Sequence, residues 1–470
     1  MRLIPRPYHP DSSALMKALS TMDYPVFLDS GMNQDQYSRY DLLMADPIAS
    51  LTQANGEIRL WQSDKADTCL MADQDIFQAV QTLLQHFAPT EKPASEFAEL
   101  PFCGGAAGYF GYDLSLSPAM TSTEPKRAQP QAQQAPDAFI GIYPWCLVID
   151  HHLKQSMLIL RSNCSQALEQ KVLHALNSVT APTSLTEATP AFSLRRPFAP
   201  AMSKAEYQNA FLRLKDYIIA GDCYQANLAQ SFSTEYAGSA FGAYLQLRRL
   251  CSSPFSAYIG LPAAAVLSFS PERFLSVRNS RVLTQPIKGT RRRDPDPGLD
   301  RSLADELVHS EKDTAENLMI VDLLRNDLGT LCRIGSVQAE KLFELQSFNN
   351  VHHLVSTISA ELPPQHHPLQ LLRNCFPGGS ITGAPKIRAM QIIAELETEP
   401  RRIYCGSVAY IGFEGQMDSN IAIRSMLCEN NQIRCWGGGG IVADSECEQE
   451  YQESLDKISL LINSLPLEHN

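Results

Sequence analysis

The feature that most constrains the fold is a pair of strand-like segments separated by only three polar residues. Residues 267–277 ("LSFSPERFLSV") and 281–290 ("RVLTQPIKGT") both have the pattern of strands, and "RNS" between them is typical of a turn. A connection this short joins two antiparallel strands. Similar strand-like segments recur along the chain, interspersed with helical ones. We therefore predict an α+β fold with antiparallel sheets rather than a doubly wound parallel sheet.

Two polar breaks indicate how the chain is organised. Residues 121–137 ("TSTEPKRAQPQAQQAPD") are rich in Pro and Gln and predict an exposed loop, and residues 181–200 ("APTSLTEATPAFSLRRPFAP") have the composition of a linker. A chain of 470 residues suits two domains or one large body. We predict an N-terminal domain at 1–195 and a C-terminal domain at 200–465.

Some helix ends are also marked in the sequence. Ser203 stands three residues before an acid in "SKAEYQNAFLRLKDYIIAGDC", which is the pattern of a capping box. Gly329 ends the strong helical pattern of "TAENLMIVDLLRNDLG". A last helix is predicted from about Ser445 to near the end of the chain.

Charge and composition exclude several classes of protein. The formal net charge of −12 argues against a general nucleic-acid binder, which needs a basic excess. No segment has the apolar length of a signal-peptide core or of a membrane-spanning helix. The twelve cysteines include no C-x-x-C pair and no zinc-like spacing, so they indicate reduced thiols. We expect a soluble, cytoplasmic protein that binds neither nucleic acid nor membranes.

Two helical segments carry paired acids. Asp313 and Glu316 in "EKDTAEN", and Glu450 and Glu453 in "EQEYQES", stand three residues apart and so share a helix face. Like charges at this spacing repel slightly unless solvent or a cation relieves them. Two such pairs facing each other would suit Mg²⁺, which takes oxygen ligands and often uses only one or two carboxylates. Two solvated helix faces are the alternative.

Two glycine-rich segments mark special backbone. "PGGSITGAPK" (377–386) is a turn that enters a helix, and its free N–H groups could hold an anion or simply cap the helix. "WGGGG" (436–440) ends a strand, where four glycines indicate positive φ or close approach of a ligand to the backbone. Neither segment is a P-loop or a dinucleotide fingerprint, which argues against nucleotide binding.

Four polar residues stand in apolar or strand-end positions. Arg424 and Tyr404 lie in segments where water should be scarce, and a buried arginine needs an acceptor, either a bound carboxylate or an internal acid. Glu272 begins the strand that leads to Lys288, so a hairpin would bring both to one cavity, where the carboxyl group could act as a general acid. A lysine at a strand end otherwise just points its ammonium group at water.

Taken together, these segments resemble the chorismate-using enzymes: the large subunits of anthranilate synthase and aminodeoxychorismate synthase, and the isochorismate and salicylate synthases. The resemblance is strong from about Ser203 to Ser459 and weaker over the N-terminal part. It implies a large antiparallel β-sandwich core flanked by helices, with chorismate bound and converted in the C-terminal domain. The strings that carry it are "GDCYQANL", "SPERFL", "PIKGTRRR", "AENLMIVDLLRNDLG", "VHHLVS", "PGGSITGAPKIRAMQII", "YCGSVAYIG", "NIAIRSM" and "GGGGIVADS…EYQES".

The resemblance implies a Mg²⁺ site and a general acid. Glu316 and Glu453 are expected to bind the metal directly, and Asp313 and Glu450 through water, so that the metal holds the ring carboxylate of chorismate. Glu272 is the expected acid that helps the C4 hydroxyl group to leave.

The resemblance also implies substrate-binding residues. Arg424 and Tyr404, with backbone amides of the glycine run, are expected to hold the enolpyruvyl carboxylate. One departure from several relatives is Asn317, which stands where they have histidine. The complete expected set is Gln225, Thr290, His353, Thr382, Tyr404, Arg424, Gly438, Gly439 and Lys457.

Two positions indicate the branch of the family. Relatives that add water to chorismate carry a lysine base where this chain has Gln225, which argues against the isochorismate and salicylate branches. Anthranilate synthases read Pro-Ile-Ala-Gly-Thr where this chain reads "PIKGT", so Lys288 resembles the branch that aminates chorismate at C4 on the way to 4-aminobenzoate and folate. There the lysine attacks C2 and forms a transient covalent adduct. Its free amine would be favoured by partial burial and by the nearby cations Arg291 to Arg293. Component I of anthranilate synthase is the alternative.

The resemblance further implies partners. The family takes ammonia from a separate glutamine amidotransferase subunit, and nothing in this chain resembles such a module. "FLDSG" (27–31) resembles the segment that lines a tryptophan pocket in anthranilate synthase, so Leu28 and Ser30 are candidates for that pocket, with an ordinary strand end as the alternative. A non-catalytic paralogue is disfavoured, because Glu272, Glu316 and Glu453 are all present.

Overall fold

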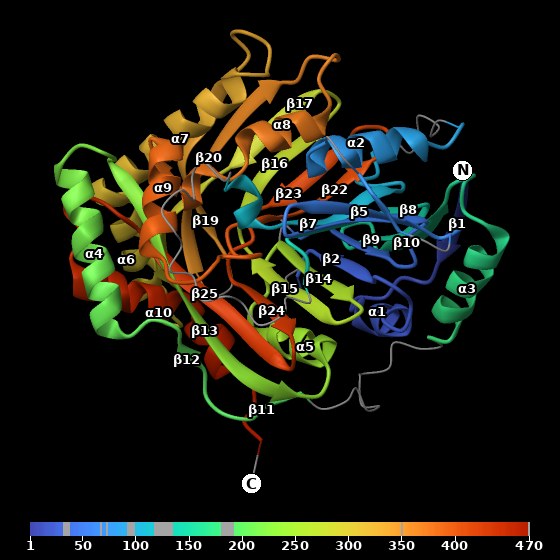
Figure 1. The fold of residues 1–470 in the computed structure, drawn as a ribbon, viewed down its shortest axis with the longest axis horizontal. Coiled ribbons are helices and arrows are strands. Elements are labelled where there is room, and N and C mark those ends of the chain that lie inside the picture. Colours follow the sequence, from blue (N-terminus) through green and yellow to red (C-terminus); the bar gives the residue numbers. More distant parts are fainter. Residues whose placement is uncertain are drawn as a thin grey trace.

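The computed structural model describes residues 1–31, 38–65, 68–71, 74–91, 99–116, 135–179, 192–348 and 351–468. These residues form two large antiparallel β-sheets with helices around them (Figure 1). The predicted α+β fold with a β-sandwich core flanked by helices is confirmed. Among the described helices, none is both long and apolar enough to cross a membrane.

The first sheet has strands from both ends of the chain side by side. In spatial order it contains β1 (Arg2–Arg6), β10 (Gln155–Leu160), β9 (Trp145–Asp150), β3 (Tyr40–Met44), β2 (Val26–Asp29), β14 (Phe255–Leu261), β15 (Ala264–Ser270), β24 (Ser425–Glu429), β25 (Gln432–Ile441), β13 (Gln225–Ala237) and β11 (Ser193–Leu194). Two short strands, β12 (Ala199–Pro200) and β21 (Gly383–Ala384), also pair with β13.

The second sheet is built in the same mixed way. Its order is β18 (Ile287–Arg292), β20 (Val351–Glu361), β17 (Arg281–Gln285), β16 (Arg273–Arg278), β23 (Met417–Asn420), β22 (Ser407–Gly412), β7 (Gly105–Phe110), β8 (Ala138–Tyr143), β4 (Ala49–Ala54), β5 (Glu57–Gln62) and β6 (Cys69–Leu70). The remaining strand, β19 (Gln338–Ser347), pairs with β20.

The described helices cover the outer faces and one end of the sandwich (Figure 1). The α-helices are α1 (Ser13–Leu19), α2 (Ile76–His86), α3 (Gln166–Asn177), α4 (Lys204–Ile219), α5 (Ala240–Leu250), α6 (Pro297–Val308), α7 (Glu311–Gly329), α8 (Pro368–Cys375), α9 (Lys386–Leu396) and α10 (Cys447–Asn463). Two short 3₁₀ helices are η2 (Tyr112–Ser115) and η3 (Gly379–Ile381).

The core lies between the two sheets. One buried apolar cluster joins Leu42 and Val266 of the first sheet to Ile140 and Leu275 of the second. A second cluster lies on the outer face of the first sheet, against helices α1, α3 and α5. Burial of these apolar side chains on both faces of the first sheet is the main force that joins the layers.

Strands from both sides of the predicted domain boundary pair with each other. β2 pairs with β14 in the first sheet, and β7 pairs with β22 in the second. Most of the predicted linker and most of the predicted loop at 121–137 lie outside the described residues. The division into 1–195 and 200–465 stays a prediction about chain segments.

The local signals read from the sequence are found in the structure. Ser203 and Glu206 form a capping box at the start of α4, and α7 ends at Gly329. β16 and β17 form the predicted hairpin, whose turn residues Asn279 and Ser280 both have positive φ. This is the geometry that two-residue hairpin turns favour.

One predicted strand is wrong. Residues 267–277 are two strands in two different sheets, because β15 ends at Ser270 and β16 begins at Arg273. Pro271 lies at the crossing, where a residue without an N–H group costs no ladder hydrogen bond. The next residue, Glu272, is therefore held at a junction between the sheets rather than within a ladder.

Candidate active site

Most of the expected site residues gather at the helical end of the sandwich. There α10 packs on β25, α7 packs on β18 and β20, and α9 packs on β13 (Figure 1). These elements carry, in turn, the acids of the last helix, the acids of "EKDTAEN", and the loop "PGGSITGAPK" next to Gln225. Segments more than 200 residues apart in the chain thus meet at one place.

Lys288 projects from β18 into this region. Its Nζ lies 3.6 Å from Oε2 of Glu316 on α7, and only 13% of its side chain is exposed. A Cβ added at Gly440 would lie 3.4 Å from this Nζ and 2.3 Å from Nε2 of Gln225. Lys288 and Gln225 therefore approach the same point above the backbone of β25. Lys288 does not simply point at water, as a lysine at a strand end usually does.

Glu272 is a buried carboxyl group in an environment suited to an acid. Burial raises its pKa from the ordinary 4.5 to about 7, although a hydrogen bond with Ser380 and the charges of Lys288 and Lys457 lower it. Glu272 is 4% exposed. The predicted approach of Glu272 to Lys288 agrees with this influence of the lysine charge.

Each expected metal-binding carboxylate is paired with a cation. Glu453 Oε1 lies 2.6 Å from Nζ of Lys457. The other pairs are Glu316 with Lys288 at 3.6 Å, Glu450 with Lys312 at 3.8 Å, and Asp313 with Arg291 at 3.2 Å. Burial by itself would raise the pKa of Glu453. The charges of Lys457, Lys312 and Lys288 outweigh this effect and lower the pKa below its ordinary value. Glu316, Glu450 and Glu453 are thus linked through shared lysines, and Asp313 is compensated separately by Arg291.

These carboxylates suit a hard cation that keeps some of its own water. The described residues contain no group of three or more His, Cys, Asp or Glu side chains arranged as metal ligands. Mg²⁺ commonly takes one or two protein carboxylates and fills the remaining positions with water and substrate oxygens. Glu316 and Glu453 are linked through the charge of Lys288, and Gly439, which has no side chain, lies next to the carboxylates of Glu450 and Glu453. The donor set therefore fits Mg²⁺.

The glycine run explains how α10 comes so close to β25. A Cβ added at Gly437 would lie 2.2 Å from the carbonyl oxygen of Ser454 on α10, and one at Gly439 would lie 3.1 Å from Oε2 of Glu450. None of the four glycines at 437–440 has positive φ. Positive φ is thus not the reason for this run; the close approach that the structure shows is that of α10 and of neighbouring side chains, and approach of a ligand stays a prediction.

Arg424 is a guanidinium group that has no acid partner among the described residues. It lies just before β24, is half-buried, and has no ion pair or side-chain hydrogen bond with the residues that the structure describes. Its φ of 50° is a left-handed conformation, which costs free energy for a residue with a side chain. Loss of solvent on burial lowers its pKa. Of the two alternatives for Arg424, an internal acid pair is thus not found among these residues.

His353 lies beside Arg424 and is neutral. Burial, together with the charge of Arg424, lowers the pKa of its imidazole to about 3. Its Nδ1 lies 2.9 Å from the hydroxyl oxygen of Thr290, and its Nε2 has no hydrogen-bond partner among the described residues. A buried nitrogen without a partner is costly, so a bound molecule that supplies one is favoured here.

Other expected residues have internal contacts. Thr382 donates a hydrogen bond to the carbonyl oxygen of Gly378, 3.0 Å away, within its own loop. Tyr404 lies before β22, not within a strand, and stacks on Trp436 with ring centroids 6.2 Å apart. Asn317 is buried and hydrogen-bonded to Ser356, 2.6 Å away. These residues support the walls of the site.

The arginines of "PIKGTRRR" do not act as free cations. Arg291 pairs with Glu306 and Asp313, and Arg293 makes a bidentate pair with Asp300. Their charges are therefore already compensated.

The hydrogen bond from Ser380 to Glu272 is the contact that sequence reasoning missed, because the two residues are 108 positions apart and no local pattern links them.

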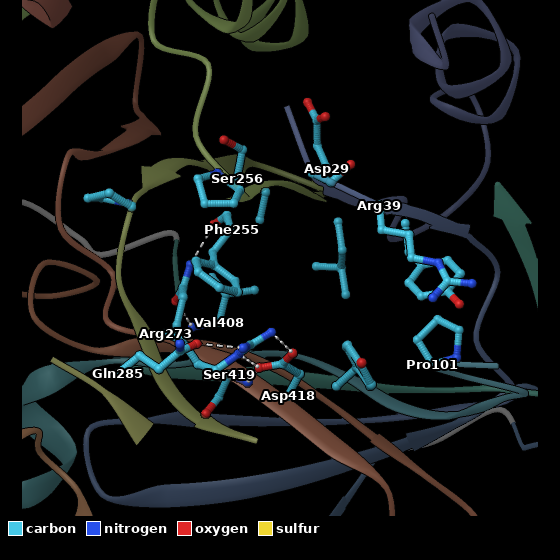
Figure 2. Close-up of a pocket in the computed structure, with 18 of the residues that line it drawn as sticks. Asp29, Arg39, Pro101, Phe255, Ser256, Arg273, Gln285, Val408, Asp418 and Ser419 are labelled. Carbon is cyan, nitrogen blue, oxygen red and sulfur yellow. Dashed lines mark hydrogen bonds and ion pairs between the residues drawn. The ribbon is translucent and has the colours of Figure 1, made fainter. Parts of the chain in front are cut away.

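A separate cavity of about 380 Å³ lies between the two sheets (Figure 2). Leu28 and Ser30, the candidates from the tryptophan-pocket resemblance, both line it. Within it, Arg273 makes a bidentate pair with Asp418 and donates a hydrogen bond to Gln285 (Figure 2). The cavity also touches Ile287, the residue before Lys288, so it lies next to β18.

The chain is similar to a known family, to named relatives and to solved structures. The family described as chorismate binding enzyme matches residues 25–463. The chain is 42% identical to aminodeoxychorismate synthase component 1 of Escherichia coli strain K12, over 95% of this chain and 94% of that one. It is 35% identical to anthranilate synthase component 1 of Geobacillus stearothermophilus, over 93% and 88%. Anthranilate synthase component I from Streptococcus pneumoniae TIGR4 superposes with a TM-score of 0.75 at 32% identity, covering 91% of this chain and 93% of that one.

The raised pKa of Glu272 predicts how stability depends on pH. The folded state holds a proton on Glu272 up to about pH 7, whereas the unfolded state releases it near pH 4.5. This contribution to stability is complete below pH 4.5 and is lost as pH rises through about 7. Glu272→Gln removes the titration. The change that it causes in the free energy of unfolding should therefore be more stabilising at pH 8 than at pH 4.5, by about 3 kcal/mol.

Urea unfolding of wild type and variant at pH 4.5 and pH 8 measures this difference. Glu57→Gln on β5 serves as the control, because this carboxylate is exposed and should give the same small change at both values. An effect of Glu272→Gln that does not depend on pH would contradict the assignment of a buried, protonated carboxyl group.

Proposed function

Because the chain belongs to the chorismate-binding enzymes, we propose that it aminates chorismate at C4 to give 4-amino-4-deoxychorismate, the precursor of 4-aminobenzoate in folate synthesis. The observation that carries the proposal is Lys288, in "PIKGT", whose Nζ lies 3.6 Å from Glu316 and shares its space with Gln225. The higher identity to the aminodeoxychorismate synthase component (42%) than to the anthranilate synthase component (35%) supports it.

Lys288 is the proposed nucleophile and Glu272 the proposed acid. The free amine of Lys288 forms a bond to C2 of chorismate, the two ring double bonds shift, and the bond from C4 to its hydroxyl group breaks. Glu272 donates its proton, so the hydroxyl group leaves as water. With a pKa of about 7, this carboxyl group holds its proton in about half of the molecules near neutral pH.

Gln225 and ammonia account for the second step. Ammonia bonds to C4, the double bonds shift back, and the bond between C2 and Lys288 breaks, so that the enolpyruvyl group is retained. Ammonia carries its own lone pair and needs no base to attack, whereas water would. Gln225 is a neutral amide that cannot take a proton from water, which favours amination over hydration.

The substrate carboxylates have separate proposed partners. Arg424, unpaired among the described residues, and Tyr404 with the amides of the glycine run would hold the enolpyruvyl carboxylate. His353 and Thr290 would line the ring, with Nε2 of His353 free to bond with it. Lys457, held near Gly438 by a 3.1 Å hydrogen bond to its carbonyl oxygen, would face the same space.

Mg²⁺ is the proposed cofactor. Glu316 and Glu453 would bind it directly, and Asp313 and Glu450 would hold its water. When bound, the ion supplies positive charge that fixes the ring carboxylate of the substrate. Glu316 and Glu453, which now pair with Lys288 and Lys457, would then turn from these amines to the ion.

A separate glutamine amidotransferase subunit is the proposed source of ammonia. The relatives named component 1 support a second component. Free ammonium at alkaline pH should replace this partner in a test with the isolated chain. A cytoplasmic location is part of the same proposal.

Product analysis tests the proposed function. Incubation of the purified chain with chorismate, Mg²⁺ and ammonium at about pH 8.5 should yield 4-amino-4-deoxychorismate without release of pyruvate, as identified by mass spectrometry. Addition of a chelator in excess over Mg²⁺ should abolish turnover. Formation of anthranilate and pyruvate would mean that the chain belongs to the anthranilate synthase branch. Turnover in the presence of the chelator would exclude Mg²⁺ as a cofactor of the reaction.

Replacement of Lys288 tests the nucleophile. Lys288→Ala should lower the rate of 4-amination by about 10³-fold or more, because the variant lacks the proposed amine that attacks C2. With ammonia withheld, mass spectrometry of the intact wild-type chain should detect a covalent adduct that the variant lacks. Lys341→Ala, an exposed lysine on β19, is the matched control and should retain full activity. Full activity of Lys288→Ala would remove the covalent mechanism.

Tryptophan is the proposed occupant of the cavity that Leu28 and Ser30 line. A volume of about 380 Å³ with apolar walls and a few polar groups suits an aromatic amino acid. Calorimetry should detect binding of tryptophan, and Leu28→Trp, which fills the cavity, should abolish it. No heat of binding at millimolar tryptophan would rule out this occupant.

A further inference from the structure

Arg401 is a buried guanidinium group that contacts no proposed reacting atom. It is 1% exposed and lies in the turn before β22, three residues before Tyr404. Its Nη2 lies 2.6 Å from Oε1 of Glu397, and its Nε lies 2.9 Å from Oε2, which is a bidentate pair. A buried charge pair of this kind is costly unless its remaining donors are satisfied.

The remaining donors of Arg401 hold two walls of the active site. Nη1 donates a hydrogen bond to the carbonyl oxygen of Ile381, 2.9 Å away, in the loop between Ser380 and Thr382. Nη2 donates to the carbonyl oxygen of Asn227, also 2.9 Å away, two residues after Gln225 on β13. The guanidinium group of Arg401 thus connects the loop of Ser380 with β13. Ser380 hydrogen-bonds Glu272, and β13 carries Gln225.

The acid partner strengthens this connection. Oε1 of Glu397 also accepts a hydrogen bond from the backbone N–H of Ala229 on β13, 2.9 Å away. Both members of the ion pair therefore bind backbone groups of β13. Movement of Arg401 would leave several buried polar groups without partners, so the arrangement is confined to one geometry.

Two aromatic rings lie against Arg401. Tyr404 belongs to a third wall of the site, and Tyr112 comes from the N-terminal part of the chain. Its guanidinium carbon lies 6.0 Å from the ring centre of Tyr404 and 4.6 Å from that of Tyr112 in η2. The hydroxyl group of Tyr112 has no hydrogen-bond partner among the described residues. The ring of Tyr112, rather than its hydroxyl group, is therefore what contacts Arg401.

We propose that Arg401 is a positioning residue for the reaction: it holds the Ser380 loop, the strand of Gln225 and Tyr404 in one fixed arrangement, and Tyr112 from the N-terminal segment keeps it there. This deepens the proposed function, since the three walls bind and protonate the substrate of that reaction. Arg401 itself touches neither the substrate nor the reacting atoms.

Arg401→Lys is the first test. Lysine retains the positive charge beside Glu397 but cannot make the fork of hydrogen bonds to Ile381 and Asn227. We expect kcat/KM for chorismate to fall by about tenfold or more, whichever product forms. The hydrogen bond of Ser380 lowers the pKa of Glu272, so a loosened loop should raise that pKa and shift the alkaline limb of the pH profile upward.

Tyr112 supplies a second pair of variants that leaves the ion pair intact. Tyr112→Leu removes the ring that faces Arg401 and should reproduce part of the loss in kcat/KM and the same upward shift of the pH profile. Tyr112→Phe keeps the ring and removes only the unpartnered hydroxyl group, so it should behave as wild type. If Arg401→Lys does not fold, this pair decides the question alone.

Arg161→Lys is the matched control for the loss of a buried arginine. Arg161 is fully buried, pairs with Glu91 and Glu414, and lies away from the site residues. It should lower the thermal midpoint as Arg401→Lys does, but leave kcat/KM and the pH profile unchanged. Equal effects of Arg401→Lys and Arg161→Lys, or of Tyr112→Leu and Tyr112→Phe, would overturn the proposal.

The pH dependence of urea unfolding gives a readout that needs no turnover. Looser contact between Ser380 and Glu272 should move the loss of stability near pH 7 to higher pH in Arg401→Lys and Tyr112→Leu, but not in their controls. If wild type does not convert chorismate, the proposed function fails, while this shift still tests the positioning role. An unchanged unfolding profile in both variants would remove that role.

Discussion

The candidate site depends on the close contact between α10 and the glycine run of β25. Any side chain at Gly437 would collide with the backbone of Ser454, and one at Gly440 would collide with Gln225 and touch Lys288. The missing side chains therefore let a helix that carries acids lie directly over a strand, and let Gln225 and a lysine from the other sheet approach the same strand at Gly440. Glycine weakens a strand, so this contact has a cost in stability that the burial of the surrounding core must offset.

The second constraint is charge. Four carboxylates and several cations share a partly buried region, and each acid has its own positive partner. An unpaired buried charge would cost several kcal/mol, so the pairing permits the fold to form before any substrate or metal arrives. Arg424 differs, since it has no such partner among the described residues, and Glu272 differs because it avoids the cost by keeping a proton near neutral pH. Arg424 is the group proposed to bind an anion, and Glu272 is the one proposed to donate a proton.

Much of the fold and the site could be predicted from local patterns. The capping box at Ser203, the helix end at Gly329 and the hairpin at Asn279 follow from short-range chemistry, and all are found. The break of the predicted strand at Pro271 could not be foreseen, because an apolar segment looks the same whether it stays in one sheet or crosses to another. The pairing of Arg291 and Arg293 with acids was also hidden, since their partners lie on α6 and α7.

The sequence by itself determined which residue types are available for chemistry: a lysine in "PIKGT", a glutamine in "CYQAN", two acid pairs at helical spacing and a run of four glycines. It also determined the α+β class, because periodicity and turn residues act over a few positions. Only the tertiary structure decided what each group experiences. The burial that raises the pKa of Glu272, the contact of Lys288 with Glu316, and the fork of Arg401 across two walls all join residues far apart in the chain. Desolvation and hydrogen-bond geometry depend on those distant neighbours, and no local pattern carries them.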